Sequence, residues 1–216
     1  MDIDFTIGDL LGLLVSLRRS GRKILSQPLG FYRVLITAKD GTSPGLMLHA
    51  WLDKDQPKQS RNTTRDIHSH TFDMRSRVLV GKLRNELYEV IEDTDGDHRL
   101  ARIRQEGPKA TRVICDTAVR VALEHCETVS AGEIYGFQAN RFHCTVVQSY
   151  PTITLMSKER MISDEAVNVI PCEYTDQDLG TYAQPELDQA RLWDRLIAVL
   201  ETTRNRHADA DEFTGS

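Results

Sequence analysis

Between Tyr32 and Ser157 the chain is divided into short apolar segments, and this pattern constrains the fold more than any other feature. Segments such as Leu46–Leu52 and Leu83–Val90 have the length of strands and are rich in apolar residues. Polar stretches with glycine, proline and aspartate separate them, as at Asp40–Gly45. Many short strands joined by turns predict a mainly β fold, an antiparallel sandwich or barrel.

The other elements are assigned in the same way. We expect further strands at 32–37, 67–70, 77–80, 111–117, 119–127, 134–137, 143–148 and 152–157. The polar stretches 53–64 and 93–108 are predicted to be long loops.

Both ends of the chain read as helical. Apolar residues recur at helical spacing in Ile7–Leu25, with basic residues toward its C-terminal end, and again in Pro185–Leu200. We expect one domain over residues 1–216. It would consist of an N-terminal helical segment (1–30), a β-barrel (31–160) and a C-terminal extension (161–216) with a helix and a disordered tail from Thr203.

Composition and charge exclude some classes of function. The formal net charge is −5, and acidic residues are mixed with the arginines, so we expect no nucleic-acid partner. The longest apolar stretch, Leu10–Val15, is too short to span a bilayer. We expect the basic first helix to pack on its own domain or on a second subunit, membrane contact being the alternative.

The cysteines and the start of the chain indicate the compartment. The 4 cysteines form no CxxC pair, which is typical of reduced thiols. The start, Met1–Asp4, is acidic rather than basic, unlike a signal peptide. We therefore expect a cytoplasmic protein.

The segment 66–73 (DIHSHTFD) carries the clearest chemical signal. His68 and His70 are two positions apart on an expected strand, so their side chains point to the same face. Neutral imidazole is a good ligand for iron, zinc, copper or nickel. Such a pair alone is equally compatible with two surface histidines.

The surrounding sequence resembles the first motif of the cupin superfamily, G-x5-HxH-x3,4-E-x6-G. Asn62 stands at the first glycine, and Asn tolerates the left-handed backbone of a turn. Gly81 closes the motif, while Met74 stands where the glutamate usually does.

The second cupin motif, G-x5-P-x-G-x2-H-x3-N, also has a counterpart. Its positions fall on Gly132, Gln138, Asn140, His143 and Val147. The resemblance covers about 32–157 and implies a single cupin barrel, an antiparallel jelly roll. It further implies one divalent metal ion held by His68, His70 and His143, with Fe(II) expected and Zn, Ni or Mn as alternatives.

Met74 departs from the motif, because a thioether is a poor ligand for a hard divalent ion. A three-histidine set is similar to that of cysteine dioxygenases, and Gly81–Tyr88 also resembles a strand pair of that group. Asp73 or Glu86 as a fourth ligand stays an alternative. Three protein ligands leave open coordination positions, as catalytic sites require.

Asp73, Arg75 and Tyr135 are the candidate catalytic residues. Asp73 is next to the ligand position, Arg75 could pair with a substrate carboxylate, and Tyr135 could donate a hydrogen bond. A turn cap, a surface arginine and a core aromatic are the respective alternatives. His49 reads as structural or pocket-lining, and Glu86 and Glu89 as outward-facing.

Metal dependence leads to an expected function. The leading hypothesis is a mononuclear non-haem Fe(II) oxygenase that acts on a small polar substrate, such as an amino acid or thiol, with molecular oxygen. A lyase, isomerase or hydrolase with Zn, Ni or Mn is the second hypothesis, and a non-enzymatic ligand-binding cupin is the third. In each, the terminal helices suit a homodimer.

Overall fold

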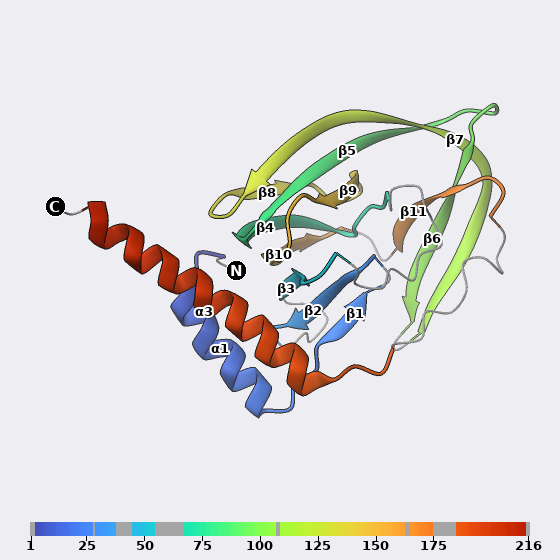
Figure 1. Ribbon diagram of the computed structural model, residues 1–216. Helices are drawn as coiled ribbons and strands as arrows, with labels where there is room; N and C mark the ends of the chain where they lie inside the picture. Colours follow the sequence, from blue (N-terminus) through green and yellow to red (C-terminus); the bar gives the residue numbers. More distant parts are fainter. Residues whose placement is uncertain are drawn as a thin grey trace.

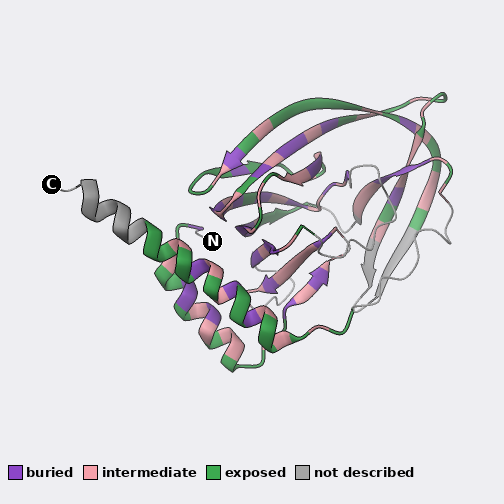
Figure 2. Ribbon diagram, in the orientation of Figure 1, coloured by how far each residue is buried: buried purple, intermediate pink, exposed green. Residues whose placement is uncertain are grey.

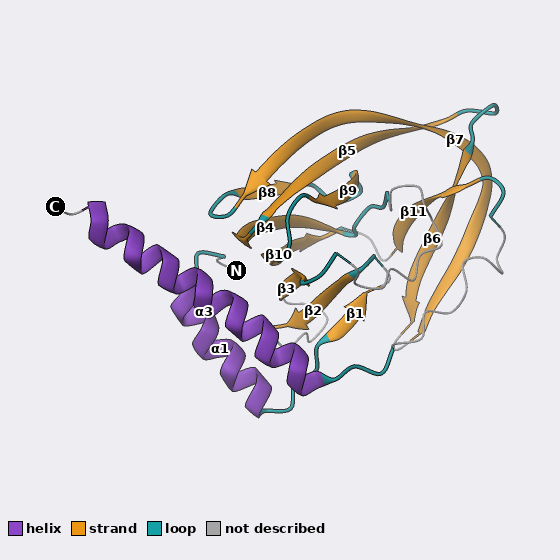
Figure 3. Cartoon of the chain, viewed as in Figure 1, coloured by secondary structure: helices purple, strands orange, loops and turns teal. Residues whose placement is uncertain are grey.

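The computed structural model describes residues 3–27, 29–37, 45–54, 67–106, 109–162, 165–174 and 185–214. They form two antiparallel sheets and the helices α1 (Ile7–Arg19) and α3 (Gln189–Thr214), which lie side by side at one end (Figures 1 and 3). Within the described residues, no helix is long and apolar enough to cross a membrane.

Sheet A is the six-stranded sheet next to the helices. Its strands, in spatial order, are β1 (Leu25–Gln27), β2 (Phe31–Leu35), β3 (Leu46–Trp51), β10 (Thr152–Met161), β4 (Phe72–Val80) and β8 (Ile134–Phe137).

Sheet B has five strands, of which two are long and curved (Figure 1). Its strands, in spatial order, are β11 (Glu165–Pro171), β6 (His98–Glu106), β7 (Lys109–Ser130), β5 (Lys82–Glu92) and β9 (Phe142–Val147).

A short segment around His68 joins the two edge strands of sheet B. His68 forms antiparallel bridges both with His143 of β9 and with Asn168 of β11. The strands therefore close into a ring. The inside of this ring holds Ile67, Tyr88 and Cys144. His68 follows Ile67 and His143 precedes Cys144, so strand alternation points both histidines out of the ring.

The chain passes repeatedly from one sheet to the other. The connections β4–β5, β7–β8, β8–β9, β9–β10 and β10–β11 all cross between sheets A and B. This is the connectivity of an antiparallel jelly roll. The expected fold class, a mainly β antiparallel jelly roll with helical segments at both ends, is confirmed.

The two helices cover the outer face of sheet A and build the main apolar core (Figure 2). The fully buried residues of this core include Leu10, Leu14, Leu196 and Leu200 from the helices and Leu48, Ile153 and Leu155 from the sheet. Burial of side chains this large stabilises the fold by about 1.5–3 kcal/mol each. The first helix packs on its own domain, one of the two arrangements expected for it.

Polar contacts fix how the helices begin and how they sit. Thr6 caps α1, because its Oγ1 accepts a hydrogen bond from the Asp9 amide at 3.1 Å. The Trp193 Nε1 of α3 donates to the carbonyl of Arg22 at 3.2 Å. Gln189 binds both backbone groups of Ile24, at 2.8 and 3.0 Å.

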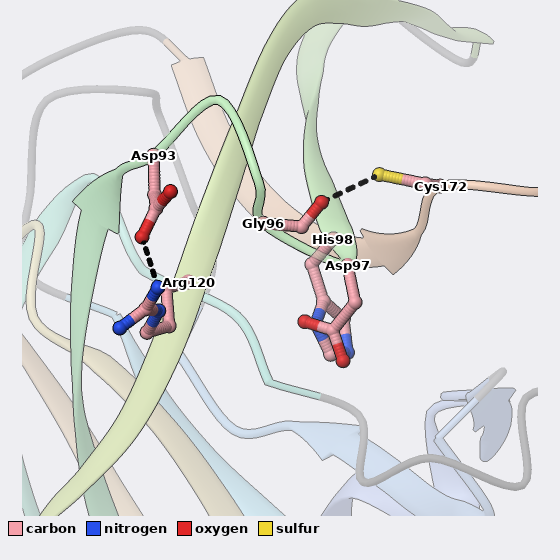
Figure 4. A network of polar contacts seen from close by, with 6 residues as sticks. All are labelled: Asp93, Gly96, Asp97, His98, Arg120 and Cys172. Carbon is pink, nitrogen blue, oxygen red and sulfur yellow. Dashed lines mark hydrogen bonds and ion pairs between the residues drawn. The ribbon is translucent and has the colours of Figure 1, made fainter.

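A polar network holds the β5–β6 turn against β7 and β11 (Figure 4). Asp93 pairs with Arg120 at 2.6 Å, and the thiol of Cys172 lies 3.5 Å from the carbonyl oxygen of Gly96. A Cβ at Gly96 would meet the backbone of Val119 at 2.4 Å, so only glycine fits this close approach.

Several expected boundaries were wrong. The predicted loop 93–108 contains β6, the two strands predicted at 111–117 and 119–127 are the single strand β7, and α3 continues past Thr203 to Thr214. The strand β6 was missed because many of its side chains are charged. Its backbone hydrogen bonds are nevertheless satisfied, since it pairs with both β7 and β11. The predicted loop 53–64 lies mostly outside the described residues.

Candidate metal centre

Three histidines from two parts of the chain converge on the face of sheet B that points toward sheet A. The possible ligand atoms of His68, His70 and His143 all lie within 4.8 Å of one another. His68 and His143 face each other across their backbone bridge, and such a pair projects both side chains to one side. His70 follows two positions later and adopts the same side.

The spacing of the nitrogen atoms suits a shared cation. The Nε2 atoms of His70 and His143 are 3.1 Å apart. Two imidazoles bound to one ion at about 2.0–2.1 Å, at angles near those of an octahedron or tetrahedron, place their nitrogens about 2.8–3.4 Å apart. His70 and His143 therefore have the spacing of two ligands of one divalent transition-metal ion.

Burial keeps these imidazoles in the form that binds metals. It lowers the pKa of His70 and of His143 well below the usual histidine value, and a charge on His68 would lower both further. The Nδ1 atom of His143 is buried, with no hydrogen-bond partner among the described residues. An unsatisfied buried polar atom of this kind costs about 1–3 kcal/mol.

Aromatic rings hold the histidines in place. The Phe72 ring stacks on His70 with centroids 4.8 Å apart, and the Phe137 ring lies 4.1 Å from that of His143. Both phenylalanines come from sheet A strands, β4 and β8. The contacts fix the ring orientations and keep water from two sides of the cluster.

The histidines line a cavity of about 530 Å³, which extends over the inner face of sheet A. Its wall combines polar and basic side chains with apolar ones, among which are Met47, Met74, Trp51 and Met156. A volume of this size suits a small organic molecule. Met74, at the position of the cupin glutamate, is buried and lines this cavity.

Asp73 and Arg75 lie on the opposite face of β4 from Met74 and do not line the cavity. The Asp73 Oδ1 accepts a hydrogen bond from the Ala139 amide at 2.8 Å, and its Oδ2 lies 3.4 Å from Nε of Arg160. Arg75 is exposed. Strand alternation thus directs both side chains away from the histidines.

Tyr135, the third candidate catalytic residue, is buried and lines the cavity. Burial raises the pKa of its phenol, while the nearby hydroxyls of Ser76 and Thr145 oppose the shift. The group therefore remains a neutral donor at ordinary pH.

Glu86 corrects one expectation. It is buried, with 1% of its surface exposed, whereas Glu89 is exposed as expected. Its carboxylate accepts a hydrogen bond from the Tyr88 hydroxyl at 2.5 Å and pairs with Arg84 at 2.6 Å. Glu86 lies opposite Cys144 rather than His143, so it projects to the other face of β9. In the described part of the chain, the three histidines are joined by no carboxylate.

The sequence reading missed three basic residues of the cavity, Arg33, Arg84 and Lys158, and left the role of His49 open. Arg33, His49 and Lys158 all line it. Burial lowers the pKa of His49 to about 3, and the charges of Arg33, Lys158 and His68 add to this effect. Strand alternation could have revealed His49, since it places Met47, His49 and Trp51 on one face of β3. The sequence did not indicate whether this face lines a cavity.

Comparisons with known proteins give weak likenesses only. No family model and no curated protein matches the chain. Similar solved structures include hydroxypropylphosphonic acid epoxidase from S. wedmorenis in complex with fosfomycin, at 10% identity and a TM-score of 0.36, over 64% of this chain and 56% of that one. This chain thus spans little more than half of the epoxidase.

An oxalate oxidase also matches, at 13% identity and a TM-score of 0.36, over 88% of this chain and 76% of that one. Drosophila melanogaster CENP-C bound to CAL1 matches at 9% identity and a TM-score of 0.30, over 64% of this chain and 75% of that one. All three TM-scores are below 0.5, so the fold assignment depends on the strand order described above.

Proposed function

We propose that this protein is a metal-dependent cupin enzyme that holds one divalent ion through His68, His70 and His143. The observation that carries the proposal is the convergence of three imidazoles, two of which desolvation keeps uncharged, on a cavity large enough for a substrate. Neutral imidazoles bind transition metals, and three protein ligands leave positions open.

The favoured reaction is that of a mononuclear non-haem Fe(II) oxygenase acting on a small polar substrate. When bound, Fe(II) would supply the redox chemistry that dioxygen requires. The protein's own residues would bind and orient. The histidines would hold the ion, and the Tyr135 phenol would donate a hydrogen bond to a polar group in the cavity.

Asp73 acquires a different role from the one expected. Its carboxylate binds the amide of Ala139, in the turn that leads into β9 and His143. We assign it as a positioning residue that fixes this turn. Arg75 has no part in the proposed chemistry, because its side chain is exposed.

One observation favours the oxygenase over a Zn, Ni or Mn lyase, isomerase or hydrolase. Those reactions usually need a general base beside the metal. Among the described residues that line the cavity, none is aspartate or glutamate. A cytoplasmic location, a homodimer and the lack of a nucleic-acid partner remain predictions from the sequence.

Elemental analysis of protein purified without chelators tests the metal site. We expect about one iron per chain. The content should fall strongly in His68→Ala and His143→Ala and stay unchanged in His125→Ala, whose histidine is exposed on β7. Stoichiometric zinc or nickel would favour the second reaction class. A protein that takes up no metal even after anaerobic iron loading would be a ligand-binding module instead.

A further inference from the structure

Three aromatic side chains form a group on the wall that sheet A contributes to the cavity. The ring centroids of Phe31 and His49 are 4.5 Å apart, those of Phe31 and Trp51 are 5.2 Å apart, and those of His49 and Trp51 are 6.3 Å apart. All three residues line the same cavity as the metal-site histidines. We call Phe31, His49 and Trp51 the aromatic wall, and the proposed metal site does not use it.

The strand register brings these rings together. Tyr32 of β2 lies opposite Ala50 of β3, and the same register continued by one residue places Phe31 opposite Trp51. His49 and Trp51 are two positions apart on β3, so they share a face. Tyr32 and Ala50 pack in the main core beneath the helices. Alternation therefore directs the aromatic wall to the other face of sheet A, toward the cavity.

Part of the aromatic wall is open to a ligand. Phe31 and His49 are only partly buried, although they lie on the face of sheet A opposite to the helices. On the helix side of the same sheet, Leu48 and Ile153 are fully buried. The rings thus keep accessible surface, and the cavity is a space that both of them line.

The aromatic wall lies close to the proposed metal site. A charge on His68 lowers the pKa of His49, and a charge on His49 lowers the pKa of His143, which requires short distances between these imidazoles. Because Phe31 and Trp51 lie against His49, a molecule that reaches the histidines has the aromatic wall beside it. A cavity of about 530 Å³ has room for one small organic molecule that contacts both.

The chemistry of this wall favours a ring over a saturated group. Aromatic rings gain an attraction from offset-stacked or edge-to-face packing, in addition to the burial of apolar area that any hydrocarbon gains. Met47 and Met156 also line the cavity, and thioether sulfur makes favourable contacts with ring edges. Both kinds of side chain therefore bind an aromatic ligand more strongly than a saturated ligand of the same size.

We propose that the substrate is a small aromatic molecule, whose ring packs on Phe31 and Trp51 while a polar substituent faces the three histidines. This inference rests on the proposed function, since it names the class of molecule that the metal site would act on. It assigns Phe31 and Trp51 as residues that determine substrate specificity.

Binding of matched ligand pairs tests the inference. Phenol and cyclohexanol, and catechol and cis-1,2-cyclohexanediol, carry the same hydroxyl groups on an aromatic or a saturated ring. Isothermal titration calorimetry of the full chain, with and without added metal, should show at least one aromatic ligand binding about two- to tenfold more tightly than its saturated partner. Phe31→Leu should remove most of this preference. Tyr32→Leu, which changes the next ring of β2 on the opposite face, should retain it.

Tryptophan fluorescence locates the bound ring. The chain has two tryptophans, Trp51 in the aromatic wall and Trp193 in the main core. Binding of catechol should change the fluorescence of the parent protein and leave that of Trp51→Phe unchanged. Trp51→Phe should nevertheless keep the preference for aromatic ligands in calorimetry, because a ring remains at this position.

The outcomes separate the inference from the proposed function. A preference for aromatic ligands in a protein that binds no metal would support the inference while the proposed function fails. Metal binding with equal affinities for aromatic and saturated ligands would overturn the inference alone. So would a fluorescence response to choline in place of phenol and catechol, because the rings would then bind a cation. If Phe31→Leu does not fold, the comparison of the parent with Trp51→Phe decides, and a response that persists in Trp51→Phe would overturn the inference.

Discussion

His68 and His143 lie directly opposite each other in an antiparallel bridge, in which each amide donates to the other's carbonyl, at 3.0 and 2.9 Å. The same backbone pair both closes the ring of sheet B and aligns two of the proposed metal ligands. Because these two hydrogen bonds join main-chain atoms, they do not require an imidazole at either position.

A first prediction follows, because the backbone of His68 forms the bridge whereas its side chain is the proposed metal ligand. His68→Gln should lose metal binding but should fold with a free energy of unfolding within about 1 kcal/mol of that of the metal-free parent. Denaturant unfolding of both metal-free proteins measures it. A loss of several kcal/mol would mean that the imidazole itself supports the ring.

The pH dependence of stability should reveal the low pKa of His49. Its pKa is about 3 in the folded protein, against 6.5 for an ordinary histidine. Between these values the unfolded chain binds a proton that the folded one does not, so stability falls as the pH drops through 6.5 toward 3. The slope is about 1.4 kcal/mol per pH unit for each such histidine.

His49→Phe should make this decline shallower, as measured by denaturant unfolding of metal-free protein from pH 7 to 4. His125→Phe, which changes an exposed histidine, is the control. An identical slope in the parent and in His49→Phe would show that folding does not lower the pKa of His49.

Met74→Glu should tighten metal binding. Met74 is buried in the cavity wall and stands where a cupin glutamate would be, so a carboxylate there adds a fourth, hard ligand. We expect at least about tenfold slower loss of metal to a chelator, with lower stability when metal-free because of the buried charge. Arg75→Glu, exposed on the same strand, should leave metal loss unchanged.

Gly81→Ala should destabilise the fold strongly. The residue has φ +81°, and a Cβ there would lie 2.5 Å from the carbonyl oxygen of Pro151. Gly132→Ala is the matched control, since its φ is +93° but nothing lies within 4 Å of the added atom. We expect a cost of about 1 kcal/mol for the control and clearly more for Gly81→Ala in denaturant unfolding. Equal costs would mean that the turn shifts to make room.

Asp73→Ala should weaken metal binding without abolishing it. The change removes the acceptor of the Ala139 amide, so the turn before His143 loses its anchor. Loss of an orienting contact around a metal site typically costs about 10- to 100-fold in affinity. Competition with a chelator measures it, and an unchanged affinity would remove Asp73 from the site.

The sequence by itself determined the class of fold and which histidines meet. Short strands and turns predicted the antiparallel barrel, and alternation placed His68 and His70 on one face. The second-motif spacing added His143 to that pair. These features are encoded locally, in residue type and spacing, so one chain is enough to read them.

Only the tertiary structure decided which strand faces line the cavity. Glu86 was expected to face outward, and nothing in the local sequence singled out Arg33 or Lys158. In the structure Glu86 is buried, and Arg33 and Lys158 line the cavity. The strand β6 was also hidden, because partners on both sides satisfy its backbone. Facing, register and cross-sheet neighbours depend on contacts between residues far apart in sequence, and a local pattern does not contain them.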